Sequence, residues 1–127
     1  MKNLLYSFLI FTFIACTARV KPKCDSVRTG KFIFNPGFSN RTYLIDRNDS
    51  FQIEKRKEDG RRWRFKIHWP EKCHYHLTYL DQDKGDTEKV DFKEVDCKIL
   101  EISDWYYIFS MSVPNMKNGI IDTMWKQ

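Results

Sequence analysis

Apolar and polar residues alternate along most of this chain from residue 30 onward. Short runs rich in aromatic and β-branched residues follow one another, and turn clusters such as NPGFSN, RNDS and KEDG separate them. This pattern is typical of consecutive β-strands joined by short loops. It predicts about eight strands, at residues 30–35, 41–46, 50–57, 61–69, 73–80, 94–102, 105–113 and 119–125. No segment combines helical periodicity with helix caps, so we expect an all-β domain.

The same alternation predicts the register of three hairpins, because a shift of one residue turns every side chain to the opposite face. Three-residue loops at 58–60, 70–72 and 102–104 bring apolar residues opposite one another; the first loop pairs Ile53 with Phe65. Together the three hairpins give one shared apolar face, which we expect to line the interior of the domain. Its predicted members are Phe51, Ile53, Trp63, Phe65, Ile67, Tyr75, Leu77, Tyr79, Ile99, Tyr107 and Phe109.

Eight antiparallel strands joined in chain order predict an up-and-down meander that closes into a small barrel, because closure leaves no exposed sheet edge. The first strand, TGKFIF, resembles the first strand of lipocalins, with Phe32 where that pattern has tryptophan. The resemblance implies a lipocalin-like barrel. A half-barrel or a β-sandwich is the alternative.

The N-terminus carries an export signal, in which Lys2 precedes a nearly unbroken apolar run that ends at Ala15. A helix of about twelve residues spans about 18 Å, which is too short for a bilayer core of about 30 Å. The following motif, FIAC, resembles a bacterial lipobox, although Phe13 stands where leucine is usual. The resemblance implies cleavage before Cys16 and attachment of diacylglycerol to its sulfur. Cleavage after Ala18, with loss of Cys16, is the alternative.

We therefore expect a signal peptide at residues 1–15, a lipidated tether at 16–27 and a β-barrel domain at 28–127. The expected location is the bacterial cell envelope, on the periplasmic face or the cell surface. Two or more acyl chains would anchor the protein firmly, since each buried methylene contributes about 0.8 kcal/mol.

Three further cysteines, Cys24, Cys73 and Cys97, face an oxidising compartment in this interpretation. In a meander, the start of the first strand and the loop after the fourth strand lie at the same end of the barrel. Cys24 and Cys73 occupy these two places, which predicts a disulfide between them. Cys97 falls inside a strand on the apolar face, where we expect it to act as a small buried hydrophobe.

All three histidines, His68, His74 and His76, lie in the stretch IHWPEKCHYHLTY. The predicted register places them on the solvent side, together with the cations of the preceding strand. These cations oppose a divalent metal ion, and no carboxylate is evident as a supporting group. The histidines are therefore weak candidates for metal ligands, and we expect a polar surface instead.

Composition and motifs narrow the classes of function. The chain of 127 residues carries a formal net charge of +5, and 42% of its residues are hydrophobic, which suits one packed domain. The basic cluster KRKEDGRRWRFK could suggest nucleic-acid binding, but the register turns Trp63 and Phe65 inward. No nucleophile elbow, phosphate-binding glycine loop, CxxC or HExxH motif occurs. We expect no catalysis, no cofactor and no nucleic-acid partner.

Three segments together, KCDSVRTGKFIF, RNDSFQIE and IHWPEKCHYHL, are similar to a group of small Bacteroidota lipoproteins. The resemblance covers roughly residues 16–112 and implies an envelope location and a related fold, but no activity. Some members carry a DNA topoisomerase IV label, which does not suit an exported chain of this size. The matching residues are Cys24, Thr29, Gly30, Phe32, Arg47, Asp49, Ser50, Gln52, Ile53, Glu54, Trp69, Cys73, Tyr75 and Leu77.

The sequence thus predicts a monomeric envelope lipoprotein that acts as a non-catalytic binding or interaction module. It favours an interaction role, with an envelope protein as partner, because the exterior faces are expected to be charged and poor in aromatic residues. The first alternative is a carrier of a small apolar ligand in the barrel interior. The others are a secreted barrel without lipid and weak metal binding by the surface histidines.

Overall fold

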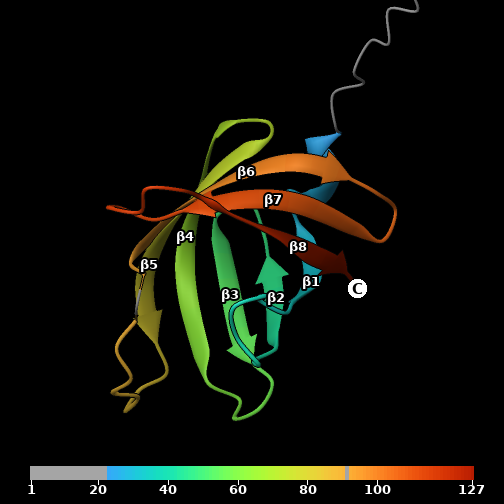
Figure 1. The fold of residues 1–127 in the computed structure, drawn as a ribbon. Coiled ribbons are helices and arrows are strands. Elements are labelled where there is room, and N and C mark those ends of the chain that lie inside the picture. Colours follow the sequence, from blue (N-terminus) through green and yellow to red (C-terminus); the bar gives the residue numbers. More distant parts are fainter. Residues whose placement is uncertain (1–22, 91) are drawn as a thin grey trace, which may run out of the picture.

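The computed structural model describes residues 23–90 and 92–127, and Figure 1 shows their fold. The predicted signal peptide and the lipidation site Cys16 lie outside the described residues. A short 3-10 helix, Cys24–Val27, comes first. Eight strands follow, with bounds that differ from the predicted ones by at most two residues: β1 Gly30–Phe34, β2 Tyr43–Arg47, β3 Phe51–Arg56, β4 Arg62–Glu71, β5 His74–Gln82, β6 Glu94–Ile102, β7 Tyr106–Ser112 and β8 Ile120–Lys126.

The strands form a closed barrel in chain order. Each strand is antiparallel to the next, and β1 also pairs with β8, with Phe34 opposite Met124. The structure therefore confirms the predicted up-and-down barrel and rules out the half-barrel and the sandwich.

The two ends of the barrel differ. One end, called the closed end below, holds the 3-10 helix, the β2–β3, β4–β5 and β6–β7 turns, and the end of β8. In Figure 1 the β4–β5 turn lies at the top and the β6–β7 turn on the right, on the side where the C-terminus is marked. The opposite or open end is formed by the β1–β2, β3–β4, β5–β6 and β7–β8 loops.

A disulfide fastens the closed end. Cys24 in the 3-10 helix is bonded to Cys73 in the β4–β5 turn, with their Cα atoms 5.2 Å apart, as the meander topology predicted. Cys24 and Val27 are both buried in the barrel core. The segment 24–27, predicted as part of the tether, therefore packs with the folded domain.

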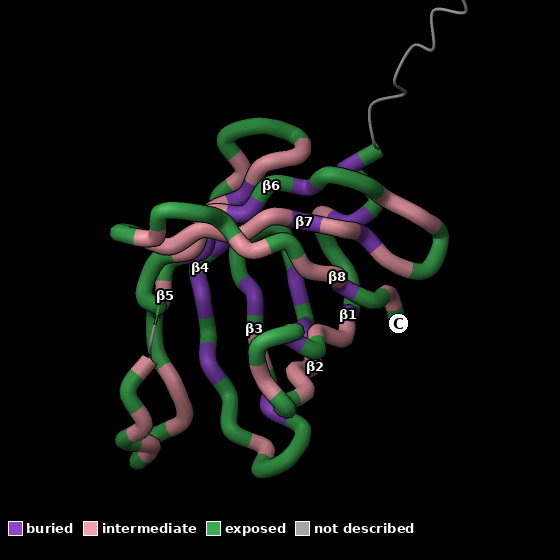
Figure 2. The backbone as a smooth tube through the Cα atoms, in the orientation of Figure 1, coloured by how far each residue is buried: buried purple, intermediate pink, exposed green. Residues whose placement is uncertain are grey.

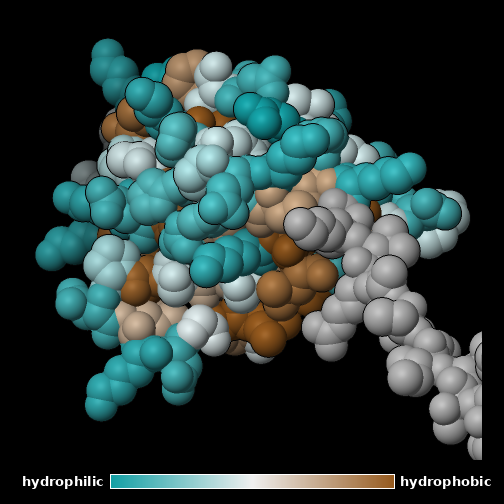
Figure 3. Space-filling model, turned by 90° about the horizontal axis from the view of Figure 1, so that it is seen from above, coloured by the Kyte–Doolittle hydropathy of each residue, from teal (hydrophilic) through white to brown (hydrophobic). Residues whose placement is uncertain are grey.

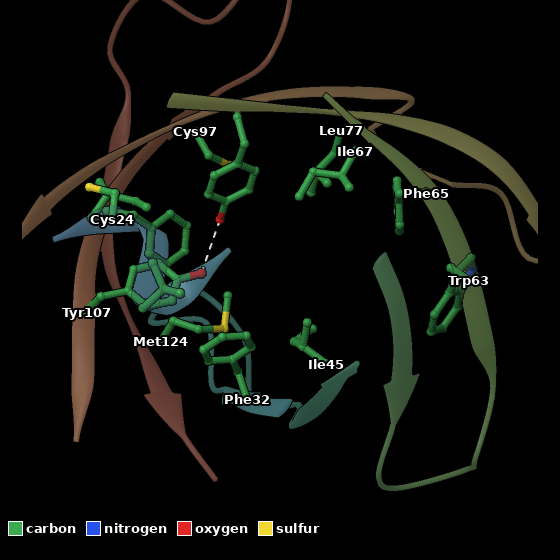
Figure 4. Packing of buried hydrophobic residues seen from close by; sticks show 14 residues of the cluster. Cys24, Phe32, Ile45, Trp63, Phe65, Ile67, Leu77, Cys97, Tyr107 and Met124 are labelled. Carbon is green, nitrogen blue, oxygen red and sulfur yellow. Dashed lines mark hydrogen bonds between the residues drawn. The ribbon is translucent and has the colours of Figure 1, made fainter. Parts of the chain in front are cut away.

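The core lies inside the barrel and is richest toward the closed end, where buried residues from most strands meet (Figure 2). Figure 4 shows side chains from opposite walls pointing into this interior. Nine of the predicted interior residues are there, with Tyr79 only partly buried: Trp63, Phe65, Ile67, Tyr75, Leu77, Tyr79, Ile99, Tyr107 and Phe109.

Two of the predicted hairpin registers have the correct faces but the wrong partners. Ile67 lies opposite Leu77 and not Tyr75, and the β6–β7 pairing is displaced in the same way. The cause is a tighter turn together with a bulge. Glu71 pairs with His74 across the two-residue turn Lys72–Cys73, which displaces the register by three residues, and a bulge between His68 and Glu71 brings the displacement back to two. A displacement of two residues leaves every side chain on its original face, which is why the interior was still predicted correctly there.

The prediction for β3 was wrong. Phe51 and Ile53 point outward and are 38% and 39% exposed, whereas Gln52 on the same strand is buried. The β3–β4 loop has four residues instead of three: the N–H of Arg56 donates to the carbonyl of Arg61 at 2.8 Å, and Gly60 adopts a φ of +73°. The extra loop residue moves the register by one position and reverses the faces of β3.

The exterior also differs from expectation, because it is not poor in aromatic residues. Trp105 is 75% exposed and Trp125 is 45% exposed. The view from above in Figure 3 shows hydrophobic side chains gathered on one part of a largely hydrophilic surface. The premise that favoured a purely charged interaction surface therefore does not hold.

Candidate functional site

The barrel interior is not filled by its own side chains. A cavity of about 190 Å³ extends from the open end toward the core. Residues from the β1–β2 loop, such as Phe38, and from the β5–β6 loop, such as Val90, surround its mouth. The interior of an eight-stranded barrel is either filled by side chains or wide enough for one small ligand. The position of this cavity corresponds to the second case.

Most of the cavity wall is aromatic or aliphatic. Phe34 of β1 and Phe109 of β7 contact each other edge to face, with ring centroids 5.6 Å apart. On the other side, Tyr43 of β2 and Trp63 of β4 stand 6.2 Å apart. Other apolar lining residues are Phe65, Leu77, Val95, Met111 and Met124.

One strip of the wall is polar, and it comes from the reversed face of β3. Gln52, Glu54 and Arg56 all line the cavity. The side-chain amide of Gln52 donates to Glu54 Oε1 at 2.8 Å, and its Oε1 accepts from Arg47 Nε at 2.7 Å. Burial raises the pKa of Glu54, an effect that the bond from Gln52 and the charge of Arg47 oppose. The Glu54 carboxyl therefore holds its proton to higher pH than an exposed glutamate does, and the protonated form offers the cavity a hydrogen-bond donor.

Below the cavity, on the closed-end side, lies the fully buried side chain of Arg47 from β2. Its guanidinium donates to the carbonyl of Val27 at 3.0 Å, to the Tyr107 hydroxyl at 2.9 Å and to the Tyr75 hydroxyl at 3.3 Å. It also lies against the ring of Phe32, 5.0 Å from its centroid. Figure 4 marks the contact between the two tyrosine hydroxyls. Arg47 thus ties the 3-10 helix to β5 and β7, and it pairs with the buried hydroxyls of Tyr75 and Tyr107.

The thiol of Cys97 reaches the cavity from β6. Burial raises its pKa to about 12, although a hydrogen bond with Tyr75 and the charge of Arg47 act in the opposite direction. A thiol with this pKa is almost entirely protonated at neutral pH, and the thiolate is the reactive form. Cys97 is therefore an inert part of the wall.

Ion pairs surround the mouth. Glu88 of the β5–β6 loop pairs with Arg56, Arg61 and Arg41, and Asp59 of the β3–β4 loop also pairs with Arg56. Hydrogen bonds from Arg56 lower the pKa of both Glu88 and Asp59 to about 2. The two loops are thereby held together over one side of the cavity.

The arginines of the basic cluster are paired with carboxylates. Arg62 pairs with Asp83 at 3.0 Å and Arg64 pairs with Asp81 at 2.5 Å, both across the β4–β5 hairpin. Trp63 and Phe65 are buried in the interior between them. The aromatic rings are thus not available for base stacking on this surface.

The three histidines lie on the outer face of the barrel. His68 is opposite His76, and His74 Nε2 lies 2.5 Å from Asp96 Oδ1, which is also 3.6 Å from His76 Nδ1. The sequence had shown no supporting carboxylate, and Asp96 now supplies one. Even so, among residues 23–90 and 92–127 no three His, Cys, Asp or Glu side chains are grouped so that they could hold a metal ion. Asp96 is therefore best described as the hydrogen-bond partner of the His74 ring, with the His76 ring beside it.

The polar members of the site, Arg47, Gln52, Glu54 and Arg56, were missed by the sequence analysis. The predicted register of β3 was wrong and placed its three polar residues on the outer face. Arg47 did leave a signal, because it shares its strand face with Tyr43 and Ile45 in the alternation of YLIDR. A charged residue on an apolar face indicates a buried, hydrogen-bonded group.

No protein-family model matches the chain, and no characterised protein matches it in sequence. No helix of the described residues is long and apolar enough to cross a membrane.

Proposed function

We propose that this protein is a lipid-anchored protein of the bacterial cell envelope whose barrel binds one small, mostly apolar molecule. The cavity carries this proposal. It opens at one end of the barrel, its wall is mainly aromatic and aliphatic, and a short polar strip lies on one side. This combination of an apolar pocket with a few fixed polar groups is typical of small-molecule sites.

The size of the cavity limits the ligand. An engineered cavity of about 150 Å³ holds benzene, so about 190 Å³ suits a single ring with a few further atoms, or one end of a longer molecule. The carboxyl of Glu54 and the amide of Gln52 would meet a hydrogen-bonding group on that molecule, such as a hydroxyl or carbonyl. Burial raises the pKa of the Cys97 thiol, so that it adds a neutral group to the cavity wall.

The proposal of a lipid anchor rests on the sequence alone. The FIAC motif and the export signal support attachment of diacylglycerol at Cys16. A disulfide in the folded domain fits an oxidising compartment outside the cytoplasm. Mass spectrometry of the protein from a producing bacterium should show the lipid, and Cys16→Ser should remove it.

The binding function can be tested with p-cresol, which has one ring and one hydroxyl, by calorimetry and by native mass spectrometry of the protein as purified. We expect binding that Val95→Phe weakens at least tenfold, because Val95 lines the cavity and the larger ring would fill it. Glu54→Gln should weaken binding less. Lys55→Gln, on the outer face of the same strand, is the matched control and should have no effect. Absence of any co-purifying molecule, together with p-cresol binding that Val95→Phe does not alter, would contradict the proposal.

A further inference from the structure

The attachment point of the tether lies at the closed end. The 3-10 helix starts at Cys24, which the disulfide fixes to the β4–β5 turn. Cys24 follows Cys16 by eight residues. Such a segment reaches at most about 28 Å when extended, and about 16 Å on average as a flexible chain. If Cys16 carries the lipid, as proposed above, the closed end stays within this distance of the membrane surface.

The same end displays a cluster of exposed apolar side chains. We call it the aromatic corner: Trp105 of the β6–β7 turn, Tyr106 of β7 and Trp125 of β8. Trp105 is 75% exposed and Trp125 is 45% exposed, whereas Tyr106 is half-buried. Tyr106 and Trp125 stack edge to face, with centroids 5.3 Å apart. In Figure 1 the β6–β7 turn and the end of β8 lie on the same side of the barrel as the start of the blue chain.

The backbone holds this corner in a fixed shape. The N–H of Lys126 donates to the carbonyl of Trp105 at 2.8 Å, and the N–H of Ser103 donates to the carbonyl of Tyr106 at 2.8 Å. Lys126 Nζ also donates to the carbonyl of Ser103 at 2.6 Å. The rings are therefore presented by a rigid turn and a strand end, so that little conformational entropy would be lost when they meet a partner.

Charge does not account for this surface. Several of the cations at the closed end are paired with carboxylates: Lys31 with Asp46, Arg28 with Asp49 and Lys72 with Asp25. Tryptophan and tyrosine, in contrast, concentrate at the boundary between lipid headgroups and acyl chains, where an apolar ring with a polar edge is best solvated. The occupant that fits is an interfacial lipid layer, bound through aromatic rings and not through net charge.

We infer that the aromatic corner docks on the surface of the membrane that holds the lipid anchor. This inference rests on the proposed attachment at Cys16, because the short tether keeps the corner at high effective concentration near the bilayer. Docking at the closed end would turn the open end, and with it the mouth of the cavity, away from the membrane.

The test uses the mature protein purified in detergent from a producing bacterium and reconstituted into vesicles of phosphatidylethanolamine and phosphatidylglycerol. Bromine on the acyl chains quenches tryptophan fluorescence only where the indole enters the bilayer interface. We expect brominated vesicles to quench the parent protein. The quenched fraction should fall at least twofold when Trp105→Phe and Trp125→Phe are combined. Trp63→Phe, which removes a buried indole, is the control and should not lower it. Added salt should not abolish the quenching.

The mass of the same sample separates the possible failures. A lipidated protein without quenching overturns the docking surface and leaves the anchor in place. A protein without lipid overturns the proposed attachment at Cys16. Its quenching in the same vesicles still shows whether the aromatic corner enters the bilayer interface. A third outcome is that the parent protein is not quenched but forms a dimer in detergent, and that the double variant is a monomer. This outcome assigns the aromatic corner to contact with a second copy of the chain and overturns the inference.

Discussion

Replacing Arg47 by alanine should destabilise the barrel by about 4 kcal/mol. The side chain makes four hydrogen bonds, to Val27, Gln52, Tyr75 and Tyr107, and all lie in the buried closed end. A buried polar group left without its partner costs about 1–3 kcal/mol. Removing the cation also removes the cost of burying its charge, so these losses do not simply add. The four partners are neutral, so no charge is left unpaired, and a loss of about 4 kcal/mol corresponds to two of them left without a partner at about 2 kcal/mol each.

The measurement is equilibrium unfolding in urea, followed by tryptophan fluorescence with the disulfide intact. For a domain of this size, about 4 kcal/mol corresponds to a fall in Tm of about 15–30 °C. Arg64→Ala is the matched control: it removes an exposed arginine with one ion pair to Asp81, and such pairs contribute about 1 kcal/mol or less.

A second variant separates hydrogen bonding from packing. Arg47→Met keeps most of the side-chain volume but none of the donors, so it should still lose at least about 2 kcal/mol. The reasoning fails if Arg47→Ala is no more damaging than Arg64→Ala. It also fails if Arg47→Met is as stable as the parent, because the four bonds would then contribute nothing net.

Three further predictions concern the mouth and the cysteines. Arg56 lowers the pKa of Glu88 from 4.5 to about 2. Between these pH values the unfolded chain binds more protons than the folded chain, so the stability of the protein should fall as the pH drops from about 4.5 to 2. Urea midpoints measured over this range should fall less for Glu88→Gln than for the parent protein. Reduction of the Cys24–Cys73 bond, whose cysteines lie 49 residues apart, should lower the free energy of unfolding by on the order of 4 kcal/mol, and an unchanged Tm would contradict this. Cys97, with its pKa of about 12, should resist iodoacetamide at about pH 8 until the protein unfolds, as mass spectrometry can show.

Much of the fold was predictable because several local signals agreed. Turn residues at regular spacing gave the strands, and the period-two pattern gave the inward faces of β4, β5, β6 and β7. The register of β3 was not predictable, because FQIEKR has apolar residues on one face and polar residues on the other, and the interior takes the polar face. Hydrophobic patterning places apolar side chains inside, and this rule fails at β3 because its inward polar side chains find hydrogen-bond partners there.

The sequence by itself determined the strand order, most of the buried face and the pairing of Cys24 with Cys73, since alternation and chain topology are local or nearly local properties. Only the tertiary structure decided between the closed barrel and the half-barrel or sandwich, and only it showed that Gln52 and Glu54 face the interior and that a cavity remains there. The length of one loop sets the faces of β3, and the fit of eight strands around a closed ring sets the empty volume. Both depend on how distant parts of the chain meet, which no stretch of sequence specifies alone.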